Sequence, residues 1–198
     1  MIGTTLEFLQ KHLDEALRVQ LEGSLDLGTA DKVVLPVLNA NASESTSFTN
    51  GAVTMVLINL EEERLCRDAD PWRRDGTAAG ASLHQPDIRL NLHLLFVARF
   101  SSSVVAWNHL TAILNHFQIT PVLDAQTAPL LPGGVDRLVF ELLSQSFTEL
   151  NDVWNALRSP YHPSLLYRAR LLVLRDPTLR VPIPVAAGEA RLSGGLVP

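Results

Sequence analysis

The chain has 198 residues, of which 46% are hydrophobic and 19% are charged, and its formal charge is −5. This length and composition are typical of one globular domain rather than of a disordered chain. The negative charge argues against general nucleic-acid binding, which needs a concentrated basic surface. The single cysteine excludes an internal disulfide framework.

The first residues show neither a signal peptide nor a bilayer-spanning segment. Glu7, Lys11 and His12 interrupt any apolar core near the N-terminus. No apolar run approaches the length of about 20 residues that crosses a membrane. We therefore expect a chain that is made and folded in the cytoplasm, without stable membrane insertion.

The N-terminal segment predicts an amphipathic helix that Thr4 or Thr5 caps and Gly23 ends. Its charged residues, Asp14 among them, are expected in water. Apolar residues recur at spacings of three and four: Leu6, Leu9, Leu13, Ala16, Leu17 and Leu21.

Two strands and two loops are expected next. Residues 31–37 predict a short strand that Pro36 confines to a sheet edge. Residues 39–51 are typical of a surface loop. Residues 52–60 are apolar on both faces, as in a central strand. Residues 66–85 lack periodicity over a span longer than compact domains need, which indicates a disordered or binding loop.

Residues 86–100 give the clearest pattern. Every second residue from Ile88 to Phe100 is apolar, which predicts a long strand at the centre of the sheet. Its other face is polar at both ends and apolar at Leu95 and Val97. We expect a second element or subunit to cover that face in part.

The remaining chain predicts two helices and two strands. A helix capped within residues 101–103 runs to Phe117, and a turn-rich loop occupies residues 124–134. A strand at residues 136–143 precedes a short helix, capped by Ser146 or Thr148. Residues 159–164 form a turn, and residues 165–174 form the last strand. The short helix has the apolar stripe Phe147, Leu150, Trp154 and Leu157.

These elements predict an α+β fold with a mixed, largely antiparallel sheet of about four to five strands, and with helices packed mainly on one side. The domain is expected to cover residues 1–174. Residues 175–198 are rich in Pro and Gly and predict an extended or mobile C-terminal extension.

Catalytic and metal-binding signatures are missing from the sequence. It contains no HExxH, G-x-S-x-G, P-loop or G-x-G-x-x-G pattern. Asp68 and Asp70 lack partner ligands in a polar loop, and His109 and His116 lack the close pairing typical of zinc sites. We expect no cofactor, no metal ion and no catalytic residue.

Two groups of side chains remain as candidates for binding. Three adjacent carboxylates, Glu61, Glu62 and Glu63, force a strand end into solvent or an interface. They could hold an acid/base pair, but a salt-bridging patch that meets Arg64 or a neighbouring subunit's arginine is favoured. The long loop adds a basic-aromatic cluster that could stack on nucleotides, although an interface is favoured: Arg67, Trp72, Arg73 and Arg74.

Three segments together resemble one protein family. They are VLINLEEERLCRD at residues 56–68, PDIRLNLHLLFVARF at residues 86–100, and residues 149–174. In this order they resemble the N-terminal domains of the cap, or tail-terminator, proteins of extracellular contractile injection systems. His93 departs from the family pattern, which has an aromatic residue there. The matching positions are Glu61 to Arg64; Pro86, Leu90, Asn91, Leu92, Leu95 and Phe96; and Leu150, Asn151, Trp154, Leu157, Pro163, Ser164, Tyr167 and Arg170.

This resemblance implies a non-enzymatic assembly protein. It implies a homohexameric ring on the end of the inner tube and the outermost sheath ring, which stops growth and anchors the sheath in the assembled particle. Our hypothesis is that Glu61–Arg64 and the Arg67–Arg74 loop form part of one contact surface. The C-terminal extension is expected to reach a neighbour or the sheath.

Two alternatives remain open at this point. One is a small hydrolase that uses the Glu61–Glu63 strand end, which requires a pocket that gathers these carboxylates with a histidine. The other is a monomeric adaptor or chaperone that binds through the Trp72 loop, which the mass of the particle in solution would distinguish from a ring.

Overall fold

The computed structural model of the chain describes residues 1–21, 32–36, 46–63, 72–73, 82–83 and 88–174. The predicted helix stop at Gly23 and the loop residues Cys66, Asp68 and Asp70 lie outside these ranges, as does segment 175–198. The division into a domain of residues 1–174 and a C-terminal extension therefore stays a prediction.

The main sheet has six strands in the order β1-β2-β5-β8-β7-β6. Only β1 and β2 pair in parallel, and all other neighbours are antiparallel. A separate two-stranded sheet pairs β3 with β4. The sheet is thus mixed and largely antiparallel, as predicted, with slightly more strands than expected. The strands are β1 Val33–Val34, β2 Ala52–Glu62, β3 Trp72–Arg73, β4 Ser82–Leu83, β5 Ile88–Arg99, β6 Val122–Asp124, β7 Arg137–Leu143 and β8 Ser164–Leu174.

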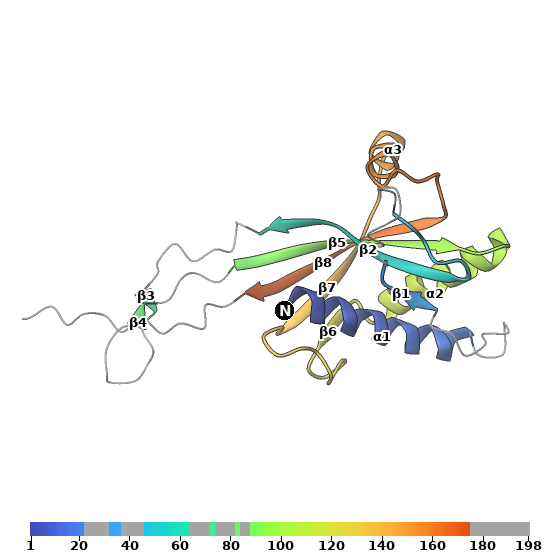
Figure 1. Ribbon diagram of the computed structural model, residues 1–198. Coiled ribbons are helices and arrows are strands. Elements are labelled where there is room, and N and C mark those ends of the chain that lie inside the picture. Colours follow the sequence, from blue (N-terminus) through green and yellow to red (C-terminus); the bar gives the residue numbers. More distant parts are fainter. Residues whose placement is uncertain (22–31, 37–45, 64–71, 74–81, 84–87, 175–198) are drawn as a thin grey trace, which may run out of the picture.

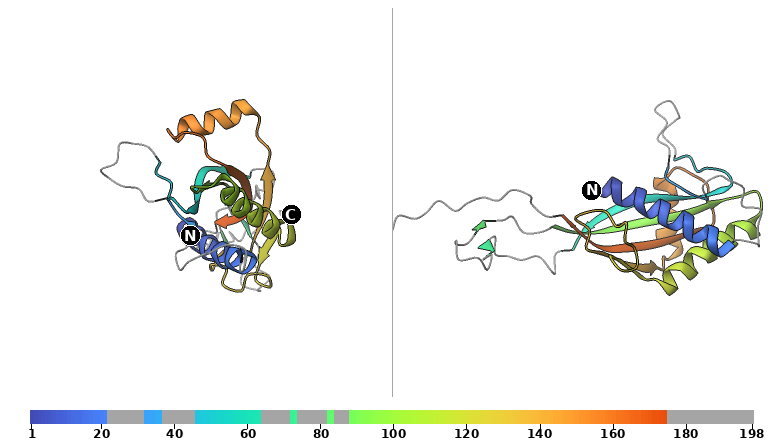
Figure 2. Two further views of the ribbon diagram at one scale, coloured as in Figure 1. Left: turned by 90° about the vertical axis from the view of Figure 1, so that its right-hand side faces the viewer. Right: turned by 90° about the horizontal axis from the view of Figure 1, so that it is seen from below.

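Helices cover the two faces of this sheet unequally. The long helices α1, Ile2–Leu21, and α2, Ser103–Ile119, lie together on one face, whereas α3, Phe147–Ala156, lies on the other (Figures 1 and 2). The prediction that helices pack mainly on one side is confirmed. The larger core lies between the sheet and the α1–α2 layer, and a smaller core lies under α3.

The larger core is built around the predicted central strand. Phe96 of β5 is fully buried and packs against Phe117 of α2 and Tyr167 of β8, with ring centroids 6.2 and 6.0 Å away. Leu9, Leu13 and Leu17 of α1 join the same core, as the spacing of three and four residues predicts. β5 lies inside the sheet between β2 and β8, so its predicted central position is confirmed.

The smaller core covers the other face of β5. Leu95 and Val97 are fully buried there beneath Trp154 of α3, together with Phe48 and Leu166. Helix α3 begins with a complete capping box, in which the Ser146 side chain accepts from the backbone N–H of Glu149 and the Glu149 carboxylate accepts from the backbone N–H of Ser146. Of the two predicted caps, Ser146 is therefore the one used.

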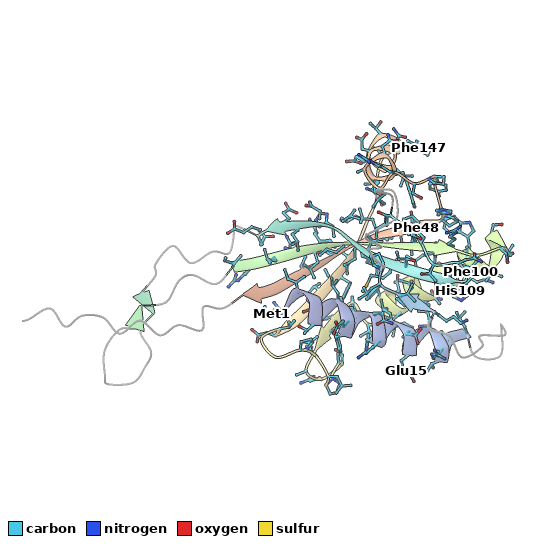
Figure 3. All side chains as sticks on the ribbon, viewed as in Figure 1. Met1, Glu15, Phe48, Phe100, His109 and Phe147 are labelled. Atoms are coloured by element: carbon cyan, nitrogen blue, oxygen red, sulfur yellow. The ribbon has the colours of Figure 1, made fainter. Side chains whose placement is uncertain are left out.

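Three sequence-based expectations about the helices are wrong. Helix α1 begins at Ile2, so Thr4 and Thr5 are not caps but lie within the first turn, where their hydroxyls donate to the Met1 carbonyl. Asp14 is buried rather than in water. Phe147 is 94% exposed, because it is the first helical residue after the cap and turns away from the sheet (Figure 3).

Two strands also differ from expectation. The predicted strand at residues 31–37 is a two-residue edge strand, Val33–Val34, which confirms the edge position but not the length. The predicted loop at residues 124–134 begins at the end of a short strand, β6, whose three residues are too few to show a period.

Strand β2 contains a β-bulge near its end. Leu57 lies opposite Leu94 of β5, whereas Asn59 lies opposite His93, so Ile58 is an extra residue. After the bulge, Glu61 lies opposite Asn91. Strand β8 has a second irregularity at the same end of the sheet, between the partners of Leu90 and Leu92.

Asp14 ties α1 to the edge of the sheet. Its carboxylate accepts hydrogen bonds from the backbone N–H groups of Lys32 and Val33 and from the Arg18 guanidinium. Burial alone would raise the pKa of Asp14, but these donors lower it below its usual value. A buried carboxylate that satisfies backbone donors at the start of β1 positions that strand beside β2.

Replacing Asp14 should destabilise the fold. Asp14→Ala leaves two backbone donors without their acceptor, so we expect the free energy of unfolding to fall by about 1–3 kcal/mol. Asp14→Asn keeps one acceptor oxygen and should cost less. Urea unfolding followed by circular dichroism measures both. Asp152→Ala, at an exposed position on α3, is the control, and a loss in Asp14→Ala no larger than in this control would contradict the role of Asp14.

The helical layer should be sensitive to acid. His116 of α2 contacts His12 of α1, with ring centroids 5.1 Å apart, and burial, together with the nearby His12, lowers the pKa of His116 from 6.5 to about 4. As the pH falls through this interval, the unfolded chain binds the proton before the folded chain does, so the free energy of unfolding decreases. Above pH 6.5 the effect vanishes.

His116→Gln removes this titration, so its free energy of unfolding should depend less on pH between pH 4 and 6.5. Urea unfolding at a series of pH values provides the comparison. Burial also lowers the pKa values of His12, His109 and His162, and these groups remain in the variant, so part of the pH dependence should persist. A pH dependence identical to that of the original chain would contradict the assignment to His116.

Candidate assembly surface

The sheet face that carries α3 is apolar under the helix and polar beyond it. Leu95 of β5 pairs with Leu166 of β8 in the smaller core, and two residues further along, His93 pairs with Arg168. Paired residues in a sheet share a face, so the polar side chains continue the same surface. We call this patch the polar ladder, and it consists of Glu61, Glu63, Asn91, His93, Glu141, Arg168 and Arg170.

Glu141 of β7 holds two arginines of β8. Arg168 donates to one carboxylate oxygen of Glu141 from Nη2 at 2.7 Å and from Nε at 3.1 Å. Arg170 donates from Nη1 to the other oxygen at 2.8 Å. These hydrogen bonds, the one from Arg170 first and those from Arg168 next, lower the pKa of Glu141. The two guanidinium groups are therefore fixed in orientation by one carboxylate.

Glu63 connects the other side of the ladder. Its Oε2 atom lies 3.7 Å from Nη2 of Arg170 and accepts a hydrogen bond from Nδ2 of Asn91 at 3.4 Å. Its backbone N–H donates to the carbonyl of Arg89 at 2.8 Å. Glu63, Asn91 and Arg170 come from the three separate sequence segments that carry the family resemblance. The three segments thus converge on one carboxylate.

Glu61 lies at the outer end of the ladder. Its Oε2 atom is 3.3 Å from Nε2 of His93, and its side chain is 54% exposed. His93 also lines a groove of about 550 Å³ between α3 and the sheet, whose walls include Val56, Val153 and Leu157. A carboxylate next to a histidine and a groove is the arrangement that the hydrolase alternative requires.

The lining of this groove contains few groups of the kind that take part in catalysis. Its side chains are mostly apolar, and Thr46 supplies the only hydroxyl among the residues that line it. Besides His93 and the adjacent Glu61, the residues that line the groove offer only the Thr46 hydroxyl as a nucleophile. Within the described ranges, no three His, Cys, Asp or Glu residues cluster closely enough to hold a metal ion.

The two histidines of α2 have separate structural roles. His109 is buried, stacks on Phe100 at a centroid distance of 4.3 Å, and places Nδ1 2.8 Å from the Val105 carbonyl (Figure 3). His116 instead contacts His12. Both therefore contribute to packing, as the absence of close zinc spacing suggested.

The predicted candidates divide into three groups. Glu61 and Glu63 lie on the ladder, whereas Glu62 lies opposite Leu90 and turns to the other face. Trp72 and Arg73 form β3, which pairs with β4. Arg64, Arg67 and Arg74 lie outside the described residues. The grouping of all eight into one interface therefore stays a prediction.

Sequence reasoning missed most of the ladder. Arg168 and Arg170 alternate with Tyr167 and Ala169, which are buried in the larger core, so a period-two pattern places the arginines on the opposite face. That pattern was visible in the last strand. The pairing of these arginines with Glu141 and Glu63 depends on strand order, which the sequence pattern does not contain.

The ladder contributes more to geometry than to stability. The side chains of Arg168, Arg170 and Glu141 are each about one-third exposed, with values of 31%, 38% and 35%. Partly exposed ion pairs each contribute about 0.2–1 kcal/mol. Their joint effect is an ordered surface of three carboxylates and two guanidinium groups at the end of the sheet beyond α3.

Comparison with known proteins points to one family. Residues 5–187 match the family model described as the Pvc16 N-terminal domain. The chain is also similar to a solved structure, the PVC sheath/tube terminator of an extracellular contractile injection system, determined by cryo-electron microscopy in the extended state. The sequence identity is 16% and the TM-score is 0.55. No curated protein sequence matches the chain.

The structural match covers 98% of this chain and 65% of the terminator, so the chain spans about two-thirds of that protein's length. At this identity the likeness shows the fold, and it confirms the α+β class that the sequence predicts. Among the described residues, no helix is long and apolar enough to cross a membrane.

Removing the central carboxylate of the ladder should have a small effect on stability. Glu141→Gln loses the charge that holds Arg168 and Arg170, and we expect the free energy of unfolding to fall by about 1 kcal/mol or less. The difference from the original chain should shrink at high salt. Urea unfolding at low and high salt measures this. Asp152→Asn is the control, and a loss that is independent of salt would contradict an electrostatic role.

Proposed function

The chain belongs to the family of Pvc16 N-terminal domains, and from this premise we propose that it is a structural assembly protein of a contractile injection particle. It caps the distal end of the inner tube and sheath, terminates their growth and anchors the sheath. The observation that carries this proposal is the match of nearly the whole chain to a protein that is itself a sheath/tube terminator.

The proposed cap is a homohexameric ring. A ring requires a heterologous contact, in which each subunit presents two different surfaces that meet and close. The subunit assembles in the cytoplasm and becomes part of the particle, where its partners are neighbouring subunits and the sheath and inner-tube proteins. Nucleic acid is not among the partners, in keeping with the net charge of −5.

The polar ladder is proposed as part of one assembly surface. Its charged groups are held in place by one another, and Glu61 is half exposed at its edge. Ordered charges at a rim favour selection of the correct partner and orientation more than raw affinity. We further propose that Arg64, Arg67, Trp72, Arg73 and Arg74 extend this surface, that Glu62 contributes from the opposite face of the sheet, and that residues 181–198 reach a neighbour or the sheath.

The subunit is proposed to have no catalytic activity. Among the residues that the structure describes, the arrangement that most favours an enzyme is the Glu61–His93 pair beside the groove under α3, and the residues that line this groove offer no nucleophile beyond Thr46. A hydrolase is therefore the weaker candidate. The monomeric adaptor is the other alternative, and it predicts a mass near that of one chain, 21.7 kDa.

Two measurements test the proposed function. Light scattering of the purified chain, alone and with the tube and sheath proteins, reports whether a ring forms. Electron micrographs of particles assembled without this protein should show overlong or unsheathed tubes. Normal particles in its absence would overturn the cap, and a monomer under all conditions would favour the adaptor.

Charge reversal at the exposed end of the ladder should weaken assembly without unfolding the subunit. In Glu61→Lys the pair of Glu63 with Arg170 is untouched, so the fold should persist by circular dichroism. We expect a several-fold loss of ring or of particle capping, measured by light scattering and micrographs. Asp152→Lys on α3 is the matched control. An intact ring in Glu61→Lys would remove the exposed end of the ladder from the assembly surface.

A further inference from the structure

Among the residues that the structure describes, the outer side of strand β2 is paired only near its start. Strand β1 pairs with β2 at Val53 and Thr54, whereas β2 continues to Glu62. Pro36, which follows β1 closely, has no N–H group to continue this pairing. An open strand edge of this kind accepts a further strand through main-chain hydrogen bonds. We call the outer side of residues 57–62 the β2 edge.

The backbone of Leu60 faces outward at this edge. The N–H of Glu63 donates to the Arg89 carbonyl at 2.8 Å, on the side of β5. Backbone groups alternate in direction along a strand, so Leu60, three residues earlier, directs its N–H and carbonyl away from β5. The N–H of Leu60 accordingly donates to the side-chain oxygen of Asn59, at 2.9 Å, and not to β5. The β2 edge therefore offers main-chain groups to an added strand.

The two faces of the β2 edge differ in character. Leu60 pairs with Leu92, which is fully buried in the larger core, so the Leu60 side chain points to the helical layer. It is nevertheless 45% exposed, because it lies at the edge of the sheet. Glu61 points to the other face and is 54% exposed. A strand that fits here needs an apolar side chain beside Leu60 and no negative charge beside Glu61.

Residues 180–185, with the sequence RVPIPV, have the pattern of such a strand. Apolar β-branched residues alternate with Pro182 and Pro184. Alternate residues of a strand share a face and direct their backbone groups to the same side. Ile183 and the two valines can therefore bond to β2, while both prolines, which lack an N–H, face away from it. Prolines on that outer side also prevent a further strand from pairing.

One antiparallel register brings these residues into agreement with both faces. Residues that lie opposite each other in a sheet share a face. With Ile183 opposite Leu60, the isoleucine side chain covers Leu60 on the side of the helical layer. Arg180 then lies opposite Glu63, on the face of the polar ladder and diagonal to Glu61. A shift by one residue would turn the prolines toward β2, so the alternation selects this register.

The chain is long enough to reach its own β2 edge. Strand β8 ends at Leu174, at the same end of the sheet as the end of β2 (Figure 1). From β8 to a strand beyond β2 there are three strand spacings, together about 14 Å. The seven residues from Leu174 to Val181 extend up to about 23 Å. A short tether of this kind gives an effective concentration of the order of millimolar, which favours the chain's own segment over that of another copy.

We propose that residues 180–185 of the free subunit form a strand on the outer edge of their own β2, antiparallel to it, with Ile183 opposite Leu60. This pairing covers the β2 edge before assembly. In the particle, residues 181–198 are proposed to contact a neighbour or the sheath, so the pairing holds this assembly segment on its own sheet until then. The inference concerns the free subunit and does not depend on the proposed cap.

Paired cysteines in the full chain test the register. In a Cys66→Ser background, Leu60→Cys/Ile183→Cys should form an intramolecular disulfide at least about tenfold faster than Leu60→Cys/Pro182→Cys, because residue 182 lies on the opposite face. Peptide mass spectrometry and non-reducing gels measure the rates and separate bonds within one chain from bonds between copies. Equal rates in the two variants would overturn the proposal. A disulfide formed mainly between copies would also overturn it, since another subunit would then supply the strand.

Amide hydrogen exchange of Leu60, followed by NMR, tests the pairing without cysteines. The Leu60 amide should exchange at least about tenfold more slowly in the full chain than in a chain that ends at Leu179. Ile183→Pro removes the N–H that bonds to the Leu60 carbonyl and should raise the rate toward that of the shortened chain. Pro184→Ala, on the outer side of the segment, is the matched control and should leave the rate unchanged.

Circular dichroism establishes that each variant keeps the fold. Equal exchange of the Leu60 amide in the full and the shortened chain would overturn the proposal, as would an Ile183→Pro variant that behaves like Pro184→Ala. Both experiments use the free subunit. A failure to form rings would therefore count against the proposed cap and leave the result on this pairing intact.

Discussion

A strand that is apolar on both faces must be covered twice, and the fold depends on that constraint. Phe96 and Leu94 of β5 face the α1–α2 layer, while Leu95 and Val97 face α3, and all four are fully buried. Each such side chain contributes about 1.5–3 kcal/mol when it leaves water. Two long helices satisfy one face, but α3 has only 10 residues and covers part of the other. The uncovered part carries the polar ladder.

The ladder therefore forms where the helical cover ends, and it joins four strands. Glu141 holds Arg168 and Arg170 across β7 and β8, and Glu63 connects Arg170 with Asn91 of β5. Partly exposed charges of this kind specify one arrangement of side chains more than they stabilise the chain. Apolar packing under α3 holds one end of this sheet face, and ordered ion pairs occupy the other end. Such an arrangement fits a subunit that keeps its shape while it binds neighbours.

Elements that depend on local pattern could be predicted from the sequence. The period of two in β5, the stripe of α1 and the cap of α3, for which Ser146 was one of two candidates, all lie within a few residues, and each was found. What could not be predicted depends on partners distant in the chain. Asp14 is buried because the backbone of residues 32 and 33 needs an acceptor, and Glu61 meets His93 because β2 and β5 are neighbours. Phe147 fits the apolar spacing of the helix, but it is the first residue of α3 and its side chain is exposed.

The bulge at Ile58 decides which side chains of β2 reach the ladder. Side chains alternate along a strand, so if the same residues paired regularly, without a bulge, Ile58, Leu60 and Glu62 would follow Val56 onto the α3 face. Glu61 and Glu63 would then turn toward the helical layer, away from His93 and Arg170. The bulge thus decides which of the adjacent glutamates face the ladder and which face the helical layer. The charge of this surface depends on the register of one strand as well as on the identity of its charged residues.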